Sequence, residues 1–595
     1  MRFWGKAYRV GIGLNRVSSL VSRLETGARN GAAQEEYTRQ LRAEEPPLVA
    51  DRRTRKLLGT GTVGFHSLGN WRLSTVALAF YFLFFLVCVR LVDVMILGPR
   101  KGYSANQMVS YETEIPRADI VDRNGNILAT SIVTASAFVN THEITDPLEV
   151  AERLPPILKE CPVDELKRKL QSGKSFVWLA RHLTPKRQDA IQRLGIPGIY
   201  LKKDYKRVYP HGNLASHVIG FCDIDGRGLS GVERSYERTL QQNQSQQPLR
   251  LSIDIRIQYI VANQLQESVD EFQAIGGNAI LMDIKTGEII AMESLPNLNA
   301  NHPGDGKSEC AFNRNTLGVN EPGSLLKILN VAIALESGKV TMQSSFDATL
   351  PVKIGKFCVT DCGRRHEVLK LRDAFIYSSN IAAIKMLQTF GGAPIQKRFF
   401  EDFGLFEKPA VELVEVGRPI FPKKWTEPTA MSSSYGYGIA ISPLKLLTTI
   451  NGIVNDGMLV EPTLIYGKQQ MRQKIISSET SSRVRDLMRE TAIYGTARSA
   501  NRYAADFRIF GKTGTTYKNA KGMGYSIAGK RRRITSFVAG FPHENPRYIL
   551  LVMLDEPKAT PQTCGQATAS WNAAPCGGKI IARIAPLLGI PAAEA

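Results

Sequence analysis

One long, uncharged run of mostly apolar residues lies near the start of this chain. Residues 73–89 read LSTVALAFYFLFFLVCV, and the apolar character continues to Leu97 past Arg90 and Asp93. A helix of this length is long enough to cross a bilayer. The run begins after 72 residues and leads into MILGPRKG, which is not a small-residue cleavage site. The pattern therefore predicts a retained transmembrane helix over residues 73–97 and not a removed signal peptide.

Further along the chain, the pattern predicts a mixed α and β region after a polar linker. The linker is Gln241–Pro248, which reads QQNQSQQP. Residues 249–269 pass from strand-like alternation to a helical pattern, and residues 277–293 read as two strands joined by a turn. Apolar, β-branched strands are expected again at Ile534–Phe541 and Tyr548–Leu554. We therefore expect one sheet assembled from both ends of the C-terminal region.

These breaks divide the chain into five parts, and charge places them in compartments. The parts are a basic tail (1–72), the transmembrane helix (73–97), a juxtamembrane domain (98–240), a C-terminal domain (249–585) and a tail (586–595). The basic tail holds 13 Lys and Arg against 6 Asp and Glu, within a formal net charge of +21 for all 595 residues. By the positive-inside rule the basic tail is cytoplasmic and the rest lies outside the inner membrane. This topology excludes nucleic acid as a partner.

Sequence motifs narrow the chemistry. No His-Glu-x-x-His, phosphate-binding glycine loop or dinucleotide fingerprint is present. A Ser-x-x-Lys pattern occurs twice, at Ser324–Lys327 and Ser442–Lys445. On a helix, residues i and i+3 share a face, so a desolvated Lys of lowered pKa can take the Ser proton while Ser attacks a carbonyl. The pattern alone does not tell a nucleophile from a helix cap.

The surroundings separate the two copies. Pro443 after Ser442 is typical of a first helical position, so Ser442 is predicted to be an N-cap. Ser324 follows Glu-Pro-Gly and opens the apolar segment LLKILNVAIAL, at a helix N-terminus that favours a developing anion. Ser324 is the better candidate nucleophile.

Two further motifs point to a family. Ser378-Ser379-Asn380 and Lys512-Thr513-Gly514-Thr515 follow the first Ser-x-x-Lys in the chain. Ser-x-x-Lys, Ser-x-Asn and Lys-Thr-Gly in this order resemble the signature set of penicillin-binding proteins and serine β-lactamases. Another Lys-Thr-Gly, at Lys285, precedes Ser324 and is predicted to be a strand turn.

The juxtamembrane domain extends the resemblance to one subgroup. Residues 117–125, RADIVDRNG, look like the opening pedestal motif of class B penicillin-binding proteins, with Ala118 where these proteins usually have Gly. Residues 207–212, 217–221 and 228–233 resemble their second pedestal motif, in the form closest to the septal, division-specific subgroup. No Glu-Asp-x-x-Phe-x-x-His motif of a class A glycosyltransferase is present. The resemblance therefore implies a non-catalytic pedestal.

For the fold, this resemblance implies an α+β transpeptidase domain, an antiparallel sheet flanked by helices, on an elongated pedestal of dimerisation type. For the chemistry, it implies that Ser324 attacks the carbonyl between the terminal D-alanines of a peptidoglycan stem peptide, and that an amine from a neighbouring stem resolves the acyl-enzyme. Lys327 is the expected general base and Ser378 the proton relay, while Asn380 orients Lys327 and the substrate amide. A β-lactam would acylate the same serine.

The Lys-Thr-Gly strand has implied roles as well. Lys512 would add positive charge that lowers the Lys327 pKa and attracts the substrate carboxylate. Thr513, Gly514 and Thr515 would bind substrate, the two threonines through their hydroxyls. The backbone N–H groups of Ser324 and Thr515 would form the oxyanion hole. The resemblance implies no cofactor and no metal.

The resemblance also implies partners and leaves rivals open. A SEDS-family septal glycan polymerase and other divisome membrane proteins are the expected partners, at the division septum of a bacterial inner membrane. The rival functions are an elongation-specific transpeptidase, a D,D-carboxypeptidase or β-lactamase, and a catalytically idle scaffold or β-lactam sensor that regulates a polymerase.

The eight cysteines and a basic cluster add secondary expectations. Cys358 and Cys362, with His366, are predicted to be a disulfide or free thiols and not metal ligands, and Cys564 and Cys576 are a second candidate pair. The run from Lys530 to Arg533 is interpreted as a solvated hairpin tip.

Overall fold

The computed structural model divides the chain into two units, Met1–Tyr111 and Glu112–Ala595. The residues that the structure describes are 67–92, 116–158, 161–242, 247–361, 367–519, 525 and 531–593.

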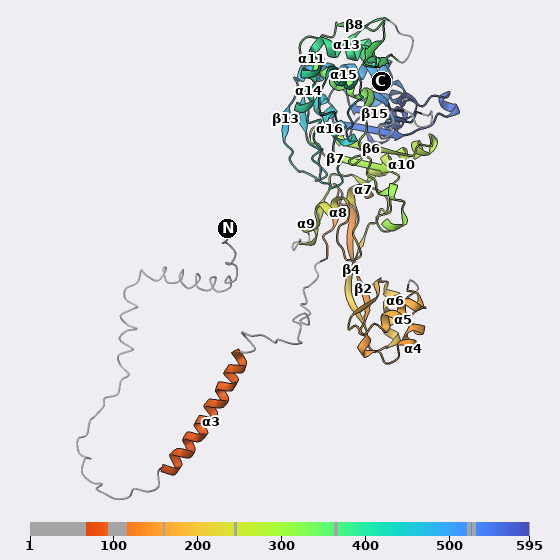
Figure 1. Cartoon of the computed structure of the whole chain (residues 1–595). Coiled ribbons are helices and arrows are strands. Elements are labelled where there is room, and N and C mark those ends of the chain that lie inside the picture. The colour runs from red at the N-terminus through yellow and green to blue at the C-terminus, as the bar shows by residue number, and fades with distance from the viewer. Residues whose placement is uncertain are drawn as a thin grey trace, which may run out of the picture. The chain divides into compact units, whose positions relative to one another are not determined.

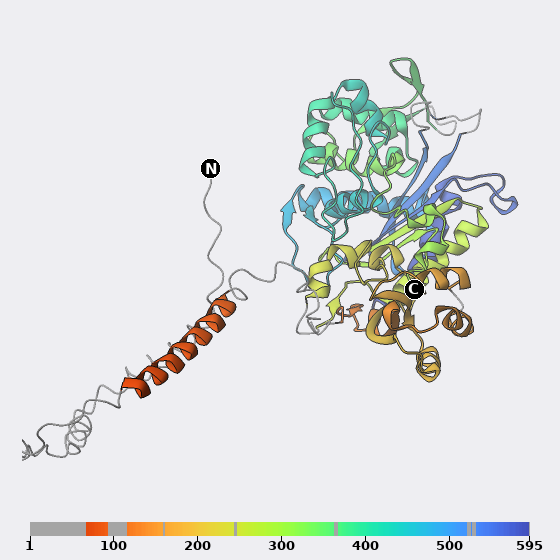
Figure 2. The same ribbon diagram turned by 60° about the horizontal axis from the view of Figure 1, so that its bottom comes forward.

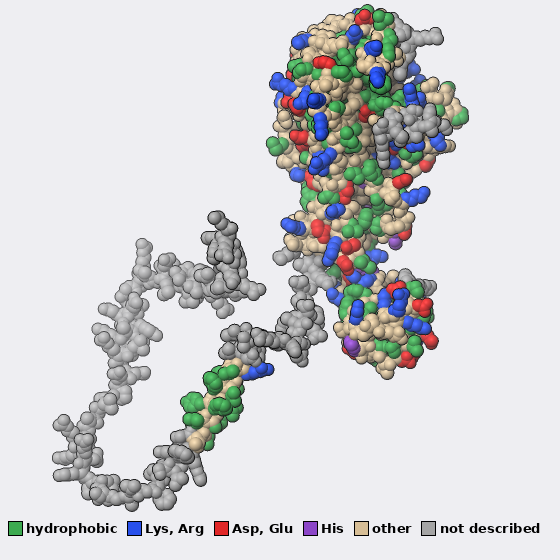
Figure 3. Space-filling view, viewed as in Figure 1, with side chains coloured by type: hydrophobic (Ala, Val, Ile, Leu, Met, Phe, Trp, Pro, Cys, Tyr) green, Lys and Arg blue, Asp and Glu red, His purple; other side chains and the backbone are tan. Residues whose placement is uncertain are grey.

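Helix α3 (Ser67–Val92) is the described part of the first unit (Figure 1). Its side chains from residue 75 to residue 91 are exposed and mostly apolar, as Figure 3 shows. Across the described residues, no helix is both long and apolar enough to cross a membrane. The predicted span of 73–97 overlaps α3, but residues 93–97 and most of the predicted basic tail lie outside the described residues.

The pedestal in the second unit is built on long antiparallel strands. Strands β2 (Ile127–Val139) and β4 (Ile199–Val208) pair in register from Thr130 opposite Val208 to Val139 opposite Ile199. Strand β3 (Val177–Leu183) lies on the other edge of β2. The apolar faces of β2 and β3 and the three helices beside them (Figure 1) enclose a small separate core. These helices are α4 (Pro147–Arg153), α5 (Val163–Leu170) and α6 (Pro185–Leu194).

The opening pedestal motif joins the pedestal to the C-terminal domain. Strand β1 (Ile120–Val121) pairs with β2 and, in parallel, with β5 (Leu249–Arg250), which follows the linker. The buried carboxylate of Asp122 accepts N–H groups of Asn124 and Asn126 at 2.8 Å and of Ile255 at 3.3 Å. Ala118 is buried without a positive φ, so the usual Gly is not required there.

A fully buried carboxylate holds the two pedestal motifs together. Glu233 Oε1 lies 2.7 Å from Arg207 Nε and its Oε2 lies 2.5 Å from Arg117 Nε. The hydroxyl of Tyr209 donates to Glu233 Oε1 at 3.3 Å. Burial opposes the charge on Arg117, but Glu233 and its other partners more than offset burial, so the pKa of Arg117 is raised. Short helices complete this region: α7 (Ser216–Ile219), α8 (Gly231–Ser235) and α9 (Glu237–Gln241).

The C-terminal domain contains the sheet expected from both ends of the region. Its five strands pair in the order β14-β15-β16-β6-β7, with each neighbouring pair antiparallel. Figure 2 shows the blue C-terminal strands of this sheet. The strands are β6 (Gly276–Asp283), β7 (Ile289–Leu295), β14 (Phe510–Tyr517), β15 (Arg533–Phe541) and β16 (Tyr548–Asp555).

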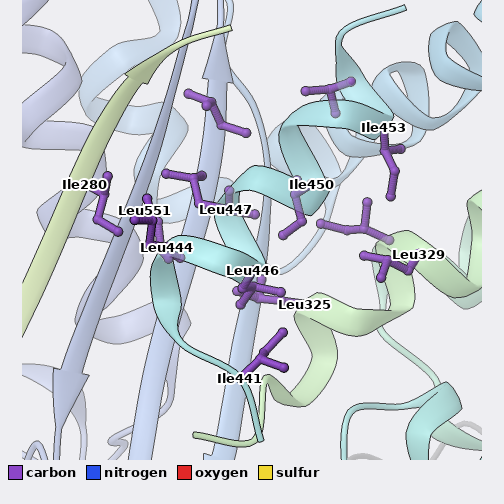
Figure 4. Packing of buried hydrophobic residues seen from close by; sticks show 14 of the residues in the cluster. Ile280, Leu325, Leu329, Ile441, Leu444, Leu446, Leu447, Ile450, Ile453 and Leu551 are labelled. Carbon is purple, nitrogen blue, oxygen red and sulfur yellow. The ribbon is translucent and has the colours of Figure 1, made fainter. Parts of the chain in front are cut away.

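Helices cover both faces of this sheet, which explains why its strands are almost continuously apolar. One face, with Leu281 and Leu550, packs on α10 (Ile255–Glu271), α18 (Arg498–Ala504) and α19 (Ala573–Ile584). The other face packs against α11 (Leu326–Glu336) and α16 (Pro443–Val454). In Figure 4, Ile280 and Leu551 lie beside Leu444 and Leu447 of α16. Ile590, in the predicted C-terminal tail, is buried in the α19 core.

The remaining elements surround this frame. The helices are α12 (Leu371–Ile376), α13 (Asn380–Phe390), α14 (Gly392–Asp402), α15 (Glu427–Ser434) and α17 (Ser478–Tyr494). The short strands are β8 (Ser345–Asp347), β9 (Val352–Ile354), β10 (Phe357–Val359), β11 (Val368–Lys370), β12 (Met458–Val460) and β13 (Arg472–Lys474). The 3-10 turns are η3 (Thr141–Glu143), η4 (Pro303–Asp305), η5 (Ser308–Ala311), η6 (Gly323–Leu325), η7 (Ala505–Phe507), η8 (Pro561–Thr563) and η9 (Ala569–Trp571).

The structural roles predicted for the other copies of the two motifs, at Lys285 and Ser442, are confirmed. Lys285 lies in the turn between β6 and β7, and its Nζ pairs with Asp456 at 2.8 Å. Ser442 is the N-cap of α16 and accepts the N–H of Lys445 at 3.3 Å. Lys285 and Ser442 therefore have structural roles, in a strand turn and at a helix N-cap.

Replacing Glu233 with Gln tests the buried charge network. The variant leaves Arg207 buried without its carboxylate, while Arg117 keeps Glu237 at 2.9 Å. Removing one partner of a buried ion pair is strongly destabilising, so we expect a loss of about 3 kcal/mol. The measurement is the urea midpoint of the full chain in detergent. Glu149→Gln, which breaks an exposed pair with Arg153, is the matched control and should leave the midpoint unchanged. An unchanged midpoint in Glu233→Gln would contradict the prediction.

Candidate active site

The candidate nucleophile lies in a tight turn that packs against β14, the edge strand of the sheet. Ser324 is half-buried in the 3-10 turn η6, directly before α11. Gly323 has φ +57, and a Cβ at this position would lie 3.1 Å from the carbonyl oxygen of Thr515 on β14. A side chain at residue 323 is therefore disfavoured by backbone strain and by lack of space. The glycine brings the Ser324 turn beside Thr515, one of the residues predicted to bind substrate.

Lys327 extends from the first turn of α11 into a buried polar pocket. The residue is only 2% exposed. Its Nζ donates to the carbonyl oxygen of Ser378 at 2.6 Å, to Asn380 Oδ1 at 2.7 Å and to Ser378 Oγ at 3.2 Å. The Ser-x-x-Lys and Ser-x-Asn motifs are thus in direct contact, although 51 residues separate Lys327 from Ser378.

Ser378 connects the two lysines of the site. Lys512 Nζ donates to Ser378 Oγ at 3.0 Å, so both amines reach the same hydroxyl. The backbone of Ser378 has φ +62, a left-handed conformation that costs energy for a residue other than Gly. This left-handed residue places the hydroxyl between helices α12 and α13, where both amines donate to it.

Asp361, which was not among the predicted site residues, holds the Ser-x-Asn motif in place. Asp361 Oδ1 accepts the N–H groups of Asn380 at 2.5 Å and Ile381 at 3.1 Å, at the N-terminus of α13. Its Oδ2 accepts the hydroxyl of Ser379, which also caps α13. A carboxylate at a helix N-terminus is stabilised by the unpaired N–H groups there. Asp361 therefore orients Asn380 toward Lys327. Its position among cysteines gave no sequence signal for this contact.

Lys512 is fully buried on β14. Burial and then the neighbouring charge of Lys327 lower the pKa of Lys512 well below 10.5. The positive charge that the resemblance assigns to Lys512 is thus opposed by its surroundings. Two amines that reach one hydroxyl titrate as a coupled pair, in two steps whose apparent pKa values belong to the pair and not to either lysine.

The threonines of the Lys-Thr-Gly strand already have partners inside the protein. Thr513 Oγ1 donates to Thr496 Oγ1 at 2.6 Å, a contact that sequence reasoning missed. Thr515 Oγ1 accepts the N–H of Ala569 at 3.2 Å. At Gly514, an added Cβ would lie 2.4 Å from Ser536 Oγ. Thr513 is buried and Thr515 is half-buried, so Thr515 is the more accessible of the two hydroxyl residues.

None of the cysteines that the structure describes forms a hydrogen bond with a residue of this site. Cys564 and Cys576 are both free, which corrects their candidate pairing, and Cys576 is buried with its Sγ 3.7 Å from the carbonyl oxygen of Gln264. Cys358 is an exposed free thiol, while Cys362, His366 and Lys530 lie outside the described residues. No group of three or more His, Cys, Asp or Glu side chains suited to a metal ion occurs in the described part of the chain.

Comparisons with known proteins place this geometry in context. Residues 277–581 match the family described as Penicillin binding protein transpeptidase domain, and residues 112–258 match the Penicillin-binding Protein dimerisation domain. The chain is 35% identical over 488 residues to a probable peptidoglycan D,D-transpeptidase FtsI of Caulobacter vibrioides, covering 80% of this chain and 82% of the relative. It is 28% identical over 501 residues to the peptidoglycan D,D-transpeptidase FtsI of Escherichia coli, covering 78% and 83%.

A solved structure shares the fold. The crystal structure of a peptidoglycan synthetase from Bifidobacterium adolescentis superposes with a TM-score of 0.63 at 20% identity, covering 81% of this chain and 97% of that structure.

The lysine pair predicts a specific pH dependence. Raising the pH removes a proton from the pair and supplies a free amine, so the rate of acylation by benzylpenicillin should rise with pH. Because Lys512 and Lys327 titrate as one coupled pair and the pKa of Lys512 is lowered, the first deprotonation of the pair, and with it this rise, should be centred well below 10.5. The measurement is the acylation rate constant of the full chain in detergent across the neutral and alkaline range.

Lys445 offers a matched control, since it is the equally buried lysine of the second Ser-x-x-Lys, and burial lowers its pKa too. Lys445→Met should leave the profile unchanged. A rise centred near the ordinary lysine value of 10.5 would contradict the coupled-pair account.

Proposed function

This chain belongs to the class B penicillin-binding proteins, and from that membership we propose how its own residues carry out the reaction. It is a serine-type peptidoglycan D,D-transpeptidase of the septal, FtsI-like kind. The observation that supports the proposal most strongly is the convergence of Lys327 and Lys512 on Ser378 Oγ, at 3.2 Å and 3.0 Å.

The first half of the reaction forms the acyl-enzyme. Ser324 Oγ attacks the carbonyl between the two terminal D-alanines of the donor stem, and its proton passes to the neutral amine of Lys327. The C–N bond then breaks, and the departing D-alanine amine takes a proton through the Ser378 hydroxyl. The hydrogen bonds from Lys327 to Ser378 and Asn380 keep the base in place for this transfer.

The second half transfers the acyl group. A neutral amine of a neighbouring stem attacks the ester carbonyl, its proton enters the same Lys327–Ser378–Lys512 pathway, and Ser324 regains its proton as the ester bond breaks. The N–H groups of Ser324 and Thr515 are the proposed oxyanion hole. The approach of the Gly323 turn to Thr515 supports this pairing. Thr513, Gly514 and Thr515 form the substrate-binding edge of β14.

We propose the cellular arrangement from the sequence. Residues 1–72 form a cytoplasmic tail, 73–97 a single anchor in the inner membrane, 98–240 a periplasmic pedestal and 249–585 the transpeptidase domain. Septal glycan polymerase of the SEDS family and other divisome membrane proteins would contact the anchor and the pedestal. The uncharged run from residue 73 to residue 89 and the basic residues before it support the anchor and its orientation.

Product analysis tests the proposed function. The full chain in detergent is given a peptidyl-D-alanyl thioester as donor and should release its thiol. When an amine acceptor is added, the amount of amide product should rise and the amount of acid formed by hydrolysis should fall. Ser324→Ala should abolish both products. Formation of the acid alone, whatever the acceptor, would favour a D,D-carboxypeptidase. Absence of both products from the folded wild-type protein would favour the idle scaffold.

A further inference from the structure

A half-satisfied carboxylate lies one turn before the nucleophile. Glu321 Oε1 accepts the N–H of Gly438 at 2.8 Å and the hydroxyl of Tyr525 at 3.0 Å. Its other oxygen, Oε2, is buried and has no hydrogen-bond partner among the described residues. A buried charged oxygen without a partner is costly, which is why such oxygens are rare in folded proteins. The free oxygen of Glu321 therefore calls for a ligand.

Three tyrosines lie close to this carboxylate and form with it a cluster that we call the aromatic box: Tyr435, Tyr437 and Tyr525. The ring centroids of Tyr435 and Tyr437 lie 5.6 Å apart, and those of Tyr437 and Tyr525 lie 5.4 Å apart in an edge-to-face arrangement. Burial first, and then the charge of Glu321, raise the pKa of each of these phenols. All three rings are thus close enough to feel the same carboxylate. They stay neutral and keep electron-rich faces, which attract cations.

This aromatic box borders the acylation site. Gly436, between Tyr435 and Tyr437, accepts the N–H of Gly323 at 3.0 Å, so the box is tied to the turn that carries Ser324. A Cβ at Gly436 would collide with the Gly323 carbonyl oxygen at 1.8 Å, which shows how closely the two segments pack. A group bound in the box would therefore lie beside the turn that carries Ser324.

In the described part of the chain, the aromatic box contains no Lys, Arg or His side chain that pairs with Glu321. Some carboxylates with little exposure pair with arginines, as Glu233 does with Arg207 and Asp555 with Arg314, whereas Asp122 and Glu293 are held by neutral N–H donors. In the parts of the chain that the structure describes, Glu321 forms no ion pair, and burial raises its pKa. A primary ammonium group would satisfy Oε2 with a charge-assisted hydrogen bond and would contact the three ring faces.

We propose that Glu321, Tyr435, Tyr437 and Tyr525 bind the side-chain ammonium group of the donor stem peptide, on the residue next to the acylated D-alanine. This inference rests on the proposed function. The donor is the appropriate source of the cation because the attacking amine of the acceptor must be neutral to react. Glu321 and the three tyrosines are thus specificity-determining residues for an alkylammonium side chain.

Two thioester donors that differ in one group test this proposal. Both carry a lysine before D-alanine, and in one of them the lysine amine is acetylated. With the wild-type full chain in detergent, kcat/KM should be about tenfold higher for the free amine, as expected for a partly desolvated cation in an aromatic box. In Glu321→Gln the preference should vanish through loss of the free-amine rate alone. The Gln carbonyl oxygen still accepts from Gly438 and Tyr525.

The controls separate the possible failures. Glu309→Gln, at an exposed carboxylate, should keep the tenfold preference. Benzylpenicillin carries no ammonium group, so its reaction with Glu321→Gln reports whether this variant folds with a reactive Ser324. If Glu321→Gln fails to fold and does not react with benzylpenicillin, Tyr525→Leu is tested in its place, because loss of one exposed ring should reduce the preference for the free-amine donor.

No preference for the free-amine donor in the wild-type protein, or a full preference in folded Glu321→Gln, would overturn the proposal. No reaction of wild type with either donor or with benzylpenicillin would instead overturn the proposed function.

Discussion

The site depends on one interaction, the sharing of a single hydroxyl by two buried amines. Lys327 and Lys512 reach Ser378 Oγ from different elements, a helix and a strand, and the hydroxyl sits on a left-handed residue between two further helices. Burial and then the charge of Lys327 lower the pKa of Lys512, so one amine of the pair loses its proton more readily than an ordinary lysine. The packing of α11, α13 and β14 therefore determines the chemistry.

The sheet supplies the rigidity that this arrangement needs. Strands from the beginning and the end of the C-terminal domain meet where β6 pairs with β16, and helices cover both faces. β14 lies at the edge of the sheet, where it carries Lys512 inward and leaves Thr515 half-buried beside the Ser324 turn. The edge position explains how one strand serves both the proposed proton pathway and the proposed substrate surface.

Sequence reasoning predicted those parts of the protein that local patterns encode. The α+β class, the sheet built from both ends, the turn at Lys285 and the cap at Ser442 follow from periodicity, turn residues and the order of three motifs. Asp361, Thr496 and Glu321 were missed because their roles arise from contacts between distant segments. Glu321, for example, meets Gly438 and Tyr525 across 117 and 204 residues. The cysteine pair 564 and 576 failed because spacing carries no information on whether two thiols meet in space.

The most direct test of the account is peptide mapping of the full chain after reaction with benzylpenicillin. The penicilloyl group is expected on the peptide that contains Ser324. Ser442→Ala should keep this modification, and a folded Ser324→Ala protein should carry none. A penicilloyl group on another peptide, or its persistence in Ser324→Ala, would contradict the assignment of the nucleophile and with it the mechanism built around the two lysines.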